Sequence, residues 1–312
     1  MKALVTGGSG FIGSNIVDAL IARGDEVQVL DNLATGRRSN LDQAIADGAV
    51  LVEESITDRD AVDSLMAAFR PDAIFHLGAQ IDVRKSVTDP AFDSVVNIGG
   101  TINLLESARE HEVGRFVFSS TGGAIYGEAE TIPTPESYVP NPEAPYGQAK
   151  YAAEGYLGLS ERLYGMSTVS LRYGNVYGPR QDPLGEAGVI AIFCGKLLGG
   201  ERPTVFGDGT QTRDYVYVGD VVAANLAAGD SDVTGPINIG TGRETSVLDL
   251  LDALSPHAKS DFTPNFEPMR LGELPRSALD VTRAQETLGW SADVSIEDGL
   301  ETTLQWAIAD AR

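Results

Sequence analysis

The sequence lacks the features that mark secreted or membrane-bound chains. Only one of its 312 residues is a cysteine, Cys194, so no disulfide can form within the chain, as is typical of a reducing compartment. No apolar run approaches the roughly 18 residues that cross a membrane, and Met1 to Val5 lead directly into a strand pattern instead of a signal peptide. We therefore expect a cytoplasmic protein without a membrane partner, with Cys194 as a small core residue.

Positive charge is also scarce. The chain has 23 lysines and arginines against 45 aspartates and glutamates, a formal net charge of −22. Nucleic acids and anionic lipids bind basic surfaces, so this balance excludes both as expected partners. No metal site is predicted. An anionic small ligand would need arginines near its site to offset the negative electrostatic potential of the protein.

Short apolar segments alternate with helical patterns along the first half of the chain. The expected strands are Lys2–Thr6, Glu26–Leu30, Val50–Val52, Ala73–Leu77, Arg115–Ser119 and Ser167–Arg172. The expected helices are Phe11–Arg23, 59–69, 92–111, 147–164 and 186–199. This alternation predicts an α/β fold with a doubly wound parallel sheet of the Rossmann type. Beyond about residue 175 the pattern loosens into loops and short strands, which predicts a smaller C-terminal lobe that binds substrate.

Three glycines, Gly7, Gly10 and Gly13, lie between the first strand and the first helix. Small residues at this spacing allow a tight turn, close approach of a pyrophosphate and a helix start that faces the phosphates. Asp31 ends the second strand, where its carboxylate can accept hydrogen bonds from adenosine ribose and would repel a 2′-phosphate. The pattern predicts NAD, although the nearby Arg37-Arg38 pair leaves NADP open.

Tyr146 and Lys150 lie four residues apart at the start of a predicted helix, on one face. The ammonium and a cationic nicotinamide ring would both lower the pKa of the phenol, which could then accept a proton. Ser119-Ser120-Thr121 follows a predicted strand, at the sheet edge where open α/β folds bind ligands. Together these groups predict hydride transfer between a secondary alcohol and NAD.

At this point the sequence resembles the extended short-chain dehydrogenase/reductase family and, within it, the UDP-galactose 4-epimerases. The resemblance covers essentially the whole chain. The motifs that carry it are Thr6 to Gly13, Asp31-Asn32-Leu33, His76 to Gln80, Ser119-Ser120-Thr121, Tyr146 to Lys150, Tyr173 to Arg180, Thr212 to Tyr215 and Arg270 to Glu273.

The resemblance implies a nucleotide-sugar 4-epimerase, an isomerase that oxidises C4 transiently with a tightly bound NAD. In it, Tyr146 would exchange the 4-hydroxyl proton, Thr121 or Ser120 would hydrogen-bond the C4 oxygen, and Lys150 would hold the nicotinamide ribose. The implied cofactor residues are Gly7, Gly10, Phe11, Ile12, Gly13, Asp31, Asn32, Ile56, Leu77, Ala79, Gln80, Asn97, Ser119, Tyr146, Lys150 and Tyr173. The implied substrate residues are Thr121, Tyr146, Asn175, Val189, Phe206, Arg213, Arg270, Glu273 and Ser277.

Several positions depart from the family pattern. Ser55 stands where an aspartate often precedes the adenine-contacting isoleucine, and Glu273 replaces an aspartate. The loop after Thr121 is one residue longer than in the best-known epimerases, so the choice of catalytic hydroxyl among Ser119, Ser120 and Thr121 stays open. Ser277 occupies the position of a bulky tyrosine that excludes N-acetylated sugars, which leaves tolerance of UDP-N-acetylhexosamines open, as is the choice between UDP and dTDP.

Other members of the family offer alternatives. Nucleotide-sugar 4,6-dehydratases resemble one another in an Asp-Glu pair where this chain has Gly122-Gly123. UDP-glucuronate 4-epimerases tend to have a threonine in place of Asn175 and an arginine in place of Asp182. A non-catalytic NAD(H) sensor would not need Tyr146 and Lys150. All three are retained as alternatives to the UDP-galactose/UDP-glucose reaction.

The change of pattern near residue 175 predicts a division of the chain, and the resemblance implies a homodimer. We assign residues 1–174 to an NAD-binding Rossmann domain, into which 213–238 crosses back, and residues 175–212 and 239–312 to a nucleotide-sugar-binding lobe. The segments 92–111 and 147–164 carry apolar residues on more than one face, as a helix-pair dimer interface would.

Overall fold

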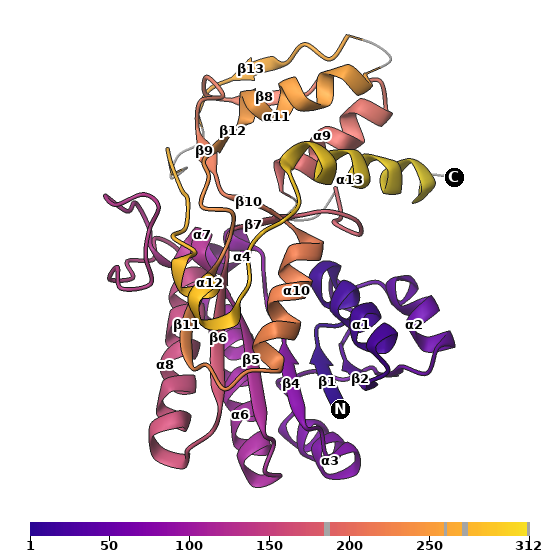
Figure 1. The fold of residues 1–312 in the computed structure, drawn as a ribbon, viewed down its shortest axis with the longest axis vertical. Helices are drawn as coiled ribbons and strands as arrows, with labels where there is room; N and C mark the ends of the chain where they lie inside the picture. Colours follow the sequence, from indigo (N-terminus) through magenta and orange to yellow (C-terminus); the bar gives the residue numbers. More distant parts are fainter. Residues whose placement is uncertain (184–187, 259–260, 270–273, 311–312) are drawn as a thin grey trace.

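A seven-stranded sheet forms the base of the molecule in the computed structural model, which describes residues 1–183, 188–258, 261–269 and 274–310 (Figure 1). Its strand order is β11-β6-β5-β4-β1-β2-β3, and every neighbouring pair is parallel. The strands are β1 (Lys2–Thr6), β2 (Glu26–Leu30), β3 (Val50–Val52), β4 (Ala73–His76), β5 (Arg115–Thr121), β6 (Thr168–Tyr173) and β11 (Gly235–Ile239). The predicted Rossmann-type sheet is confirmed.

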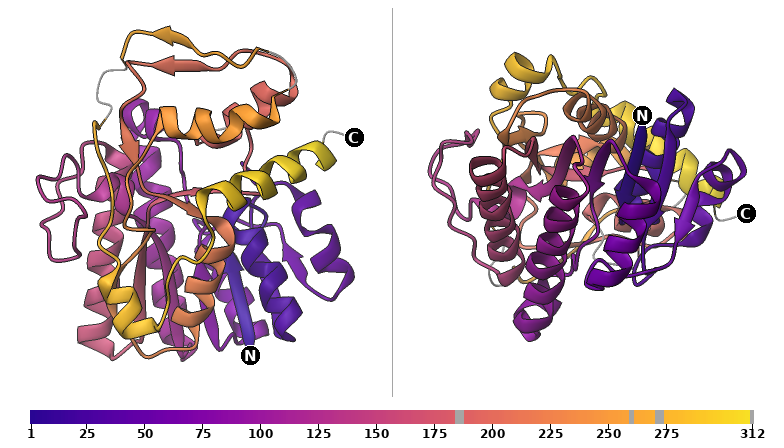
Figure 2. Two further views of the ribbon diagram at one scale, coloured as in Figure 1. Left: turned by 45° about the horizontal axis from the view of Figure 1, so that its top comes forward. Right: turned by 90° about the horizontal axis from the view of Figure 1, so that it is seen from below.

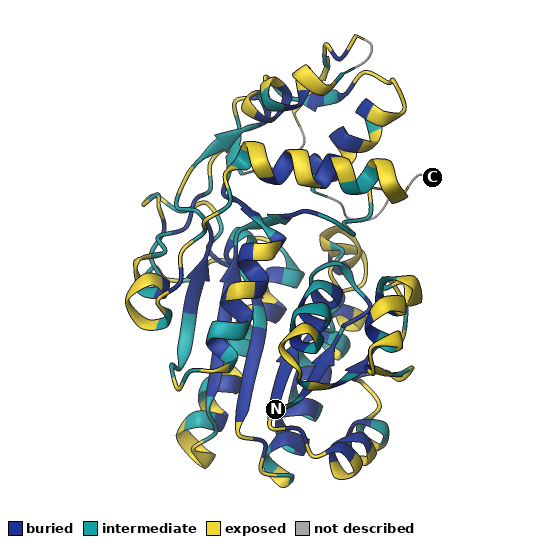
Figure 3. Ribbon diagram, turned by 45° about the vertical axis from the view of Figure 1, so that its right-hand side comes forward, coloured by how far each residue is buried: buried dark blue, intermediate teal, exposed yellow. Residues whose placement is uncertain are grey.

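Helices cover both faces of this sheet, so the strands are apolar on both sides. Helices α1 (Phe11–Arg23), α10 (Val218–Gly229) and α12 (Thr282–Leu288) pack on one face, and α3 (Arg59–Phe69), α6 (Gly100–Glu110) and α8 (Pro145–Tyr164) on the other. Alternate residues of β1 serve the two cores: Ala3 and Val5 point into the first, and Leu4 into the second. Figure 3 shows the buried strands between helices whose outer faces are exposed. A continuous apolar run is what a doubly covered parallel strand requires.

The order of strands reverses between β1 and β4. The chain first moves from β1 through β2 to β3, then returns to the other side of β1 with β4 and continues to β5 and β6. Loops that leave β1 and β4 therefore part in opposite directions, and a crevice opens at the carboxyl ends of these strands. This is where the predicted site residues converge.

The predicted helix 92–111 is divided in the structure. It consists of α5 (Pro90–Ser94), a π-helical turn η2 (Val95–Gly99) and α6. Other helices had no sequence prediction: η1 (Arg38–Leu41), α2 (Asp42–Ala46), α4 (Val83–Thr88), α7 (Gly122–Ile125), α11 (Val247–Leu254), η3 (Ser255–His257) and α13 (Ile296–Asp310). A π-helical turn such as η2 often occurs beside functional sites.

A smaller lobe lies beyond the carboxyl edge of the sheet, at the top of Figure 1 and in the left view of Figure 2. Its helices α9 (Val189–Leu198), α11 and α13 share a separate core with β8 (Thr204–Phe206), which pairs with β13 (Asn265–Glu267). Cys194 is buried in this core, and burial raises the pKa of its thiol to about 12. The prediction of a small core cysteine is confirmed.

Two short sheets connect the lobe to the large sheet. Strand β7 (Asn175–Tyr177) pairs with β10 (Tyr215–Tyr217), and β9 (Thr212–Arg213) pairs with β12 (Thr245–Ser246). Farther along the chain, Ala284 and Trp290 return to the core of the large sheet, where the Trp290 indole donates to the carbonyl of Asp220 at 2.9 Å. In the described part of the chain no helix combines the length and apolarity that crossing a membrane demands.

Candidate active site

A cavity of about 970 Å³ lies where the strand order reverses. Its walls come from the turns after β1, β2 and β4, from the end of β5 and from the start of α8. This volume lies within the usual range of cofactor and ligand pockets.

The turn after β1 is built to let phosphates approach. Gly7 has a positive φ of 69°, and a Cβ atom there would lie 2.6 Å from the amide nitrogen of Gly78. A Cβ on Gly13 would lie 2.2 Å from the carbonyl oxygen of Gly7. Helix α1 then begins at Phe11 with no side-chain cap from the described residues, and its first three residues line the cavity. Free amides at a helix start are a natural pyrophosphate site.

Asp31 is held in place at the end of β2. Its Oδ2 accepts a hydrogen bond from the amide of Ser9 at 2.8 Å, and its Oδ1 accepts one from the amide of Leu33 at 2.8 Å. The two nearby arginines are turned to other carboxylates: Arg37 pairs with Asp182 at 2.8 Å, and Arg38 pairs with Glu53 at 3.0 Å. This arrangement suits a ribose diol better than a 2′-phosphate.

The structure brings nearly all predicted cofactor residues to the cavity. Those that line it are Gly7, Gly10, Phe11, Ile12, Gly13, Asp31, Asn32, Ile56, Leu77, Ala79, Gln80, Ser119, Tyr146, Lys150 and Tyr173. Asn97 is different: it is buried behind the wall, where its Nδ2 donates to the carbonyl of Gln80 at 2.9 Å and its Oδ1 accepts from the amide of Gln80 at 2.8 Å. Asn97 thus braces Gln80 and does not line the cavity.

Tyr146 and Lys150 lie at the start of α8 and both line the cavity. The Lys150 ammonium donates to the carbonyl of Ser119 at 2.9 Å, and the Tyr146 amide donates to the Ser86 hydroxyl at 3.1 Å. Burial raises the pKa of Tyr146 to about 12, and the Asp93 carboxylate adds to this shift. The predicted lowering of the phenol pKa by Lys150 and a cationic nicotinamide ring concerns the cofactor-bound site and stays a prediction. Burial also lowers the pKa of Lys150 to about 8.

The three hydroxyls at the end of β5 have different surroundings. Ser120 donates to Glu154 Oε1 at 2.6 Å, and the same carboxylate is held by Arg172 in a buried ion pair, with 2.6 Å between Arg172 Nη2 and Glu154 Oε2. The Ser119 hydroxyl hydrogen-bonds the phenol of Tyr173 and so opposes the rise of its pKa on burial. Thr121 lines the same cavity as Tyr146, and its hydroxyl makes no hydrogen bond to the described residues.

The predicted substrate residues divide between the cavity and the lobe. Asn175 lines the cavity, with its amide fixed by the carbonyl of Asp214 at 2.7 Å. On the lobe side, Arg213 Nη1 donates to the carbonyl of Leu274 at 2.7 Å, three residues before the predicted gate Ser277. Residues Val189, Phe206, Arg213 and Ser277 lie outside the cavity lining. Arg270 and Glu273 lie outside the described residues.

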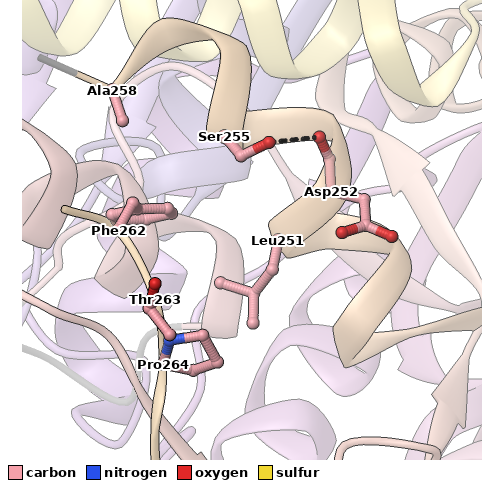
Figure 4. Close-up of a pocket in the computed structure, with 7 residues that line it drawn as sticks. All are labelled: Leu251, Asp252, Ser255, Ala258, Phe262, Thr263 and Pro264. Atoms are coloured by element: carbon pink, nitrogen blue, oxygen red, sulfur yellow. Dashed lines mark hydrogen bonds between the residues drawn. The ribbon is translucent and has the colours of Figure 1, made fainter.

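A second hollow of about 350 Å³ lies on the lobe, between α11 and the segment before β13 (Figure 4). One hydrogen bond joins its lining residues, from the Ser255 hydroxyl to the carbonyl of Asp252 at 3.0 Å. Its lining offers a single titratable group, Asp252, which is exposed. The chemistry is therefore concentrated in the larger cavity.

Sequence reasoning missed the buried charges behind the site. Asp93, Glu154 and Arg172 are each largely buried. Asp93 and Glu154 accept hydrogen bonds from predicted site residues, and Arg172 pairs with Glu154. The spacing of Asp93 and Asn97, four residues apart in a helical segment, was the available signal for one of them. Arg172 gave a second signal as a charged residue inside an apolar strand segment.

A family model for NAD dependent epimerases and dehydratases matches residues 3–240. The chain belongs to the NAD dependent epimerase/dehydratase family. NAD is the family's cofactor, and the glycine turn, Asp31 and the uncapped start of α1 fit its pyrophosphate and adenosine ribose.

Individual relatives in this family match the full length of the chain. It is 46% identical over 308 residues to a UDP-glucose 4-epimerase of Mycolicibacterium smegmatis, with 98% of each chain covered. The structure of a Thermotoga maritima UDP-glucose 4-epimerase with UDP-glucose has a TM-score of 0.96 at 48% identity and covers 100% of both chains. That of a Thermus thermophilus UDP-glucose 4-epimerase with NAD has a TM-score of 0.91 at 44% identity and covers 98% of both.

Proposed function

We propose that the protein is a UDP-glucose 4-epimerase that interconverts UDP-galactose and UDP-glucose with a retained NAD. One observation carries the proposal: Tyr146, Lys150 and Thr121 line the same cavity as the glycine turn and Asp31. The full-length similarity to the epimerases named above supports it.

The chain's own residues handle the proton of the sugar. Bound NAD supplies the uptake and return of the C4 hydrogen as hydride, together with a positive charge on its ring. Tyr146 accepts the proton of the 4-hydroxyl and later gives it back, and Thr121 hydrogen-bonds the C4 oxygen. Because burial raises the pKa of Tyr146 to about 12, its phenolate needs nearby positive charge, which Lys150 and the nicotinamide ring provide together.

The smaller lobe holds the nucleotide sugar in this proposal, and the larger half holds NAD. Asn175, Val189, Phe206, Arg213 and Ser277 contact the sugar nucleotide. The roles of Arg270 and Glu273, which lie outside the described residues, stay predictions. Arginine forms charge-assisted hydrogen bonds to diphosphate oxygens, which a protein of net charge −22 needs locally.

The pair of glycines after Thr121 argues against dehydration. A Cβ on Gly122 would lie 2.5 Å from Leu279 Cδ1, so an acidic side chain there would require Leu279 to move. Without a carboxyl pair at this point, removal of water from the sugar lacks its acid and base.

We also propose a homodimer in the cytoplasm. Exposed apolar side chains gather on α8, among them Tyr156, Leu159 and Leu163. Antiparallel packing of this helix from two copies would cover them. Light scattering on the purified protein should give twice the mass of the 33.0 kDa chain, and Leu163→Glu should lower it to that of one chain.

The decisive experiment for the activity is Tyr146→Phe. We expect its kcat on UDP-galactose to fall by about a hundredfold to ten-thousandfold, because the proton acceptor is lost. Tyr151→Phe, at an exposed tyrosine on the same helix, is the matched control. An unchanged rate in Tyr146→Phe would contradict the proposed mechanism.

A further inference from the structure

A buried carboxylate lies behind the cofactor wall. Asp93 of α5 is 1% exposed. Its Oδ1 accepts hydrogen bonds from Gln80 Nε2 at 2.8 Å and from Asn97 Nδ2 at 3.0 Å. Its Oδ2 is also buried but has no hydrogen-bond partner among the described residues. An unpartnered carboxylate oxygen is costly to bury, so a favourable interaction with a nearby positive charge is expected.

Lys150 is a buried positive charge with only one hydrogen-bond partner among the described residues. It is 4% exposed, and its ammonium donates to the carbonyl of Ser119 at 2.9 Å and lies 4.7 Å from the centre of the Phe118 ring. It makes no direct ion pair within the described part of the chain. A buried ammonium with a single carbonyl partner tends to lose its proton unless a negative charge lies close.

Two carboxylates raise the pKa of Lys150, and one of them already forms an ion pair with Arg172. Both Asp93 and Glu154 favour the charged form of the lysine. Both oxygens of Glu154, however, accept hydrogen bonds from Arg172, and one also accepts from Ser120. Asp93 is therefore the carboxylate that retains an uncommitted oxygen.

We propose that Asp93 is the buried counter-ion of Lys150 and sets the pH range in which the Tyr146–Lys150 pair exchanges the substrate's proton. Asp93 acts through the other two side chains and is a positioning residue, since it does not line the cavity. Its catalytic consequence rests on the function proposed above. Its electrostatic link to Lys150 does not.

The other charged and titratable groups near the pair leave this assignment intact. His76 of β4 is fully enclosed between Thr6 and Thr101, and burial holds its pKa well below the usual range, so it stays neutral. Lys85 of α4 is exposed and lies over the Phe92 ring. On β6, Arg172 is neutralised by Glu154, and burial raises the pKa of Tyr173 to about 12.

The sign of the effect follows from the charge. A negative Asp93 raises the pKa of both Tyr146 and Lys150. Because the two groups are coupled, they titrate as a pair with two apparent pKa values. Removal of the carboxylate charge lowers both values, so the whole pH optimum moves toward acid.

Asp93→Asn tests this directly, because the amide oxygen can still accept the hydrogen bonds from Gln80 and Asn97. We expect both limbs of the pH profile of kcat to move to lower pH by about one unit. Glu143→Gln, which removes an exposed charge just before α8, is the matched control and should leave the profile in place. A lower rate in Asp93→Asn with both limbs unmoved would overturn the proposal.

A stability cycle tests the same link without any activity. Lys150→Met leaves Asp93 buried without a counter-ion. The Tm of this variant should therefore fall further below that of the unaltered protein as the pH rises above the range where Asp93 becomes charged. Adding Asp93→Asn should remove that pH dependence and restore part of the Tm. Strictly additive effects of the two changes would overturn the counter-ion proposal, whatever the protein epimerises. Failure of the epimerase assay alone, with the cycle coupled, would refute only the proposed function.

Discussion

The large sheet and the smaller lobe position their candidate site residues in different ways. In the large half, strand ends and one tight turn bring nearly every predicted cofactor residue to a single cavity. In the smaller lobe and the short sheet that joins it to the large one, Phe206 and Arg213 lie on strands of three and two residues, outside the lining of that cavity. Cofactor chemistry is therefore set by the topology of the large sheet, whereas sugar selection depends on how the loops of the lobe meet it.

The largest effect is expected from a substitution in the glycine turn after β1, which should affect the cofactor half alone. In Gly13→Ala, the new methyl group would lie 2.2 Å from the carbonyl oxygen of Gly7. We expect a loss of about 1–3 kcal/mol in the free energy of unfolding and protein that purifies without NAD. Absorbance and cofactor release on denaturation measure this. Gly155→Ala, inside α8 with open space around it, should be neutral or stabilising. Retention of NAD in Gly13→Ala would contradict the role of the turn.

The next largest effect should separate the hydroxyls at the end of β5. Thr121→Ala should lower kcat about tenfold to a hundredfold, because a hydrogen bond to the C4 oxygen is lost. Ser120→Ala should change kcat much less, since Ser120 is engaged with Glu154. Steady-state rates on UDP-galactose compare them, and the reverse order would assign the catalytic hydroxyl to Ser120.

In the lobe, Arg213→Ala should act on substrate binding alone. We expect KM for UDP-galactose to rise about tenfold, with retained NAD unchanged, because a charge-assisted contact to the diphosphate is lost. Arg202→Ala, an exposed arginine of the same lobe, serves as control. If Arg213→Ala released NAD, the division of labour between the two halves would fail.

The smallest effect concerns the size of the sugar. Ser277→Tyr should lower kcat/KM for UDP-N-acetylgalactosamine about tenfold and leave UDP-galactose nearly unchanged, because the larger side chain fills the space of the acetamido group. If the unaltered protein turned over UDP-N-acetylgalactosamine only in traces, the tolerance that Ser277 leaves open would be refuted.

The sequence predicted those features that short-range patterns determine. The glycine turn, the apolar strands and the Tyr146–Lys150 spacing each lie within a few residues, and the parallel sheet follows from their alternation. By contrast, the Glu154–Arg172 pair joins residues on α8 and β6, and the link between Asp93 and Lys150 joins α5 to α8. No local pattern specifies such contacts.

The raised pKa of the Tyr146 phenol in the chain without cofactor could not be predicted for a related reason. An i, i+4 lysine was visible in the sequence, but the burial of Tyr146 and the approach of Asp93 were not, and these two effects raise the pKa. The division of the helix 92–111 around η2 was likewise hidden, because its apolar spacing hardly distinguishes a π-helical turn from an α-helical one.

The central claim is that a retained NAD accepts hydrogen from C4 of the sugar and returns it to the same carbon. Purified protein, without added cofactor, should be incubated with UDP-galactose deuterated at C4. The account predicts UDP-glucose that still carries the deuterium at C4. Loss of the deuterium to water, or a requirement for added NAD, would contradict it.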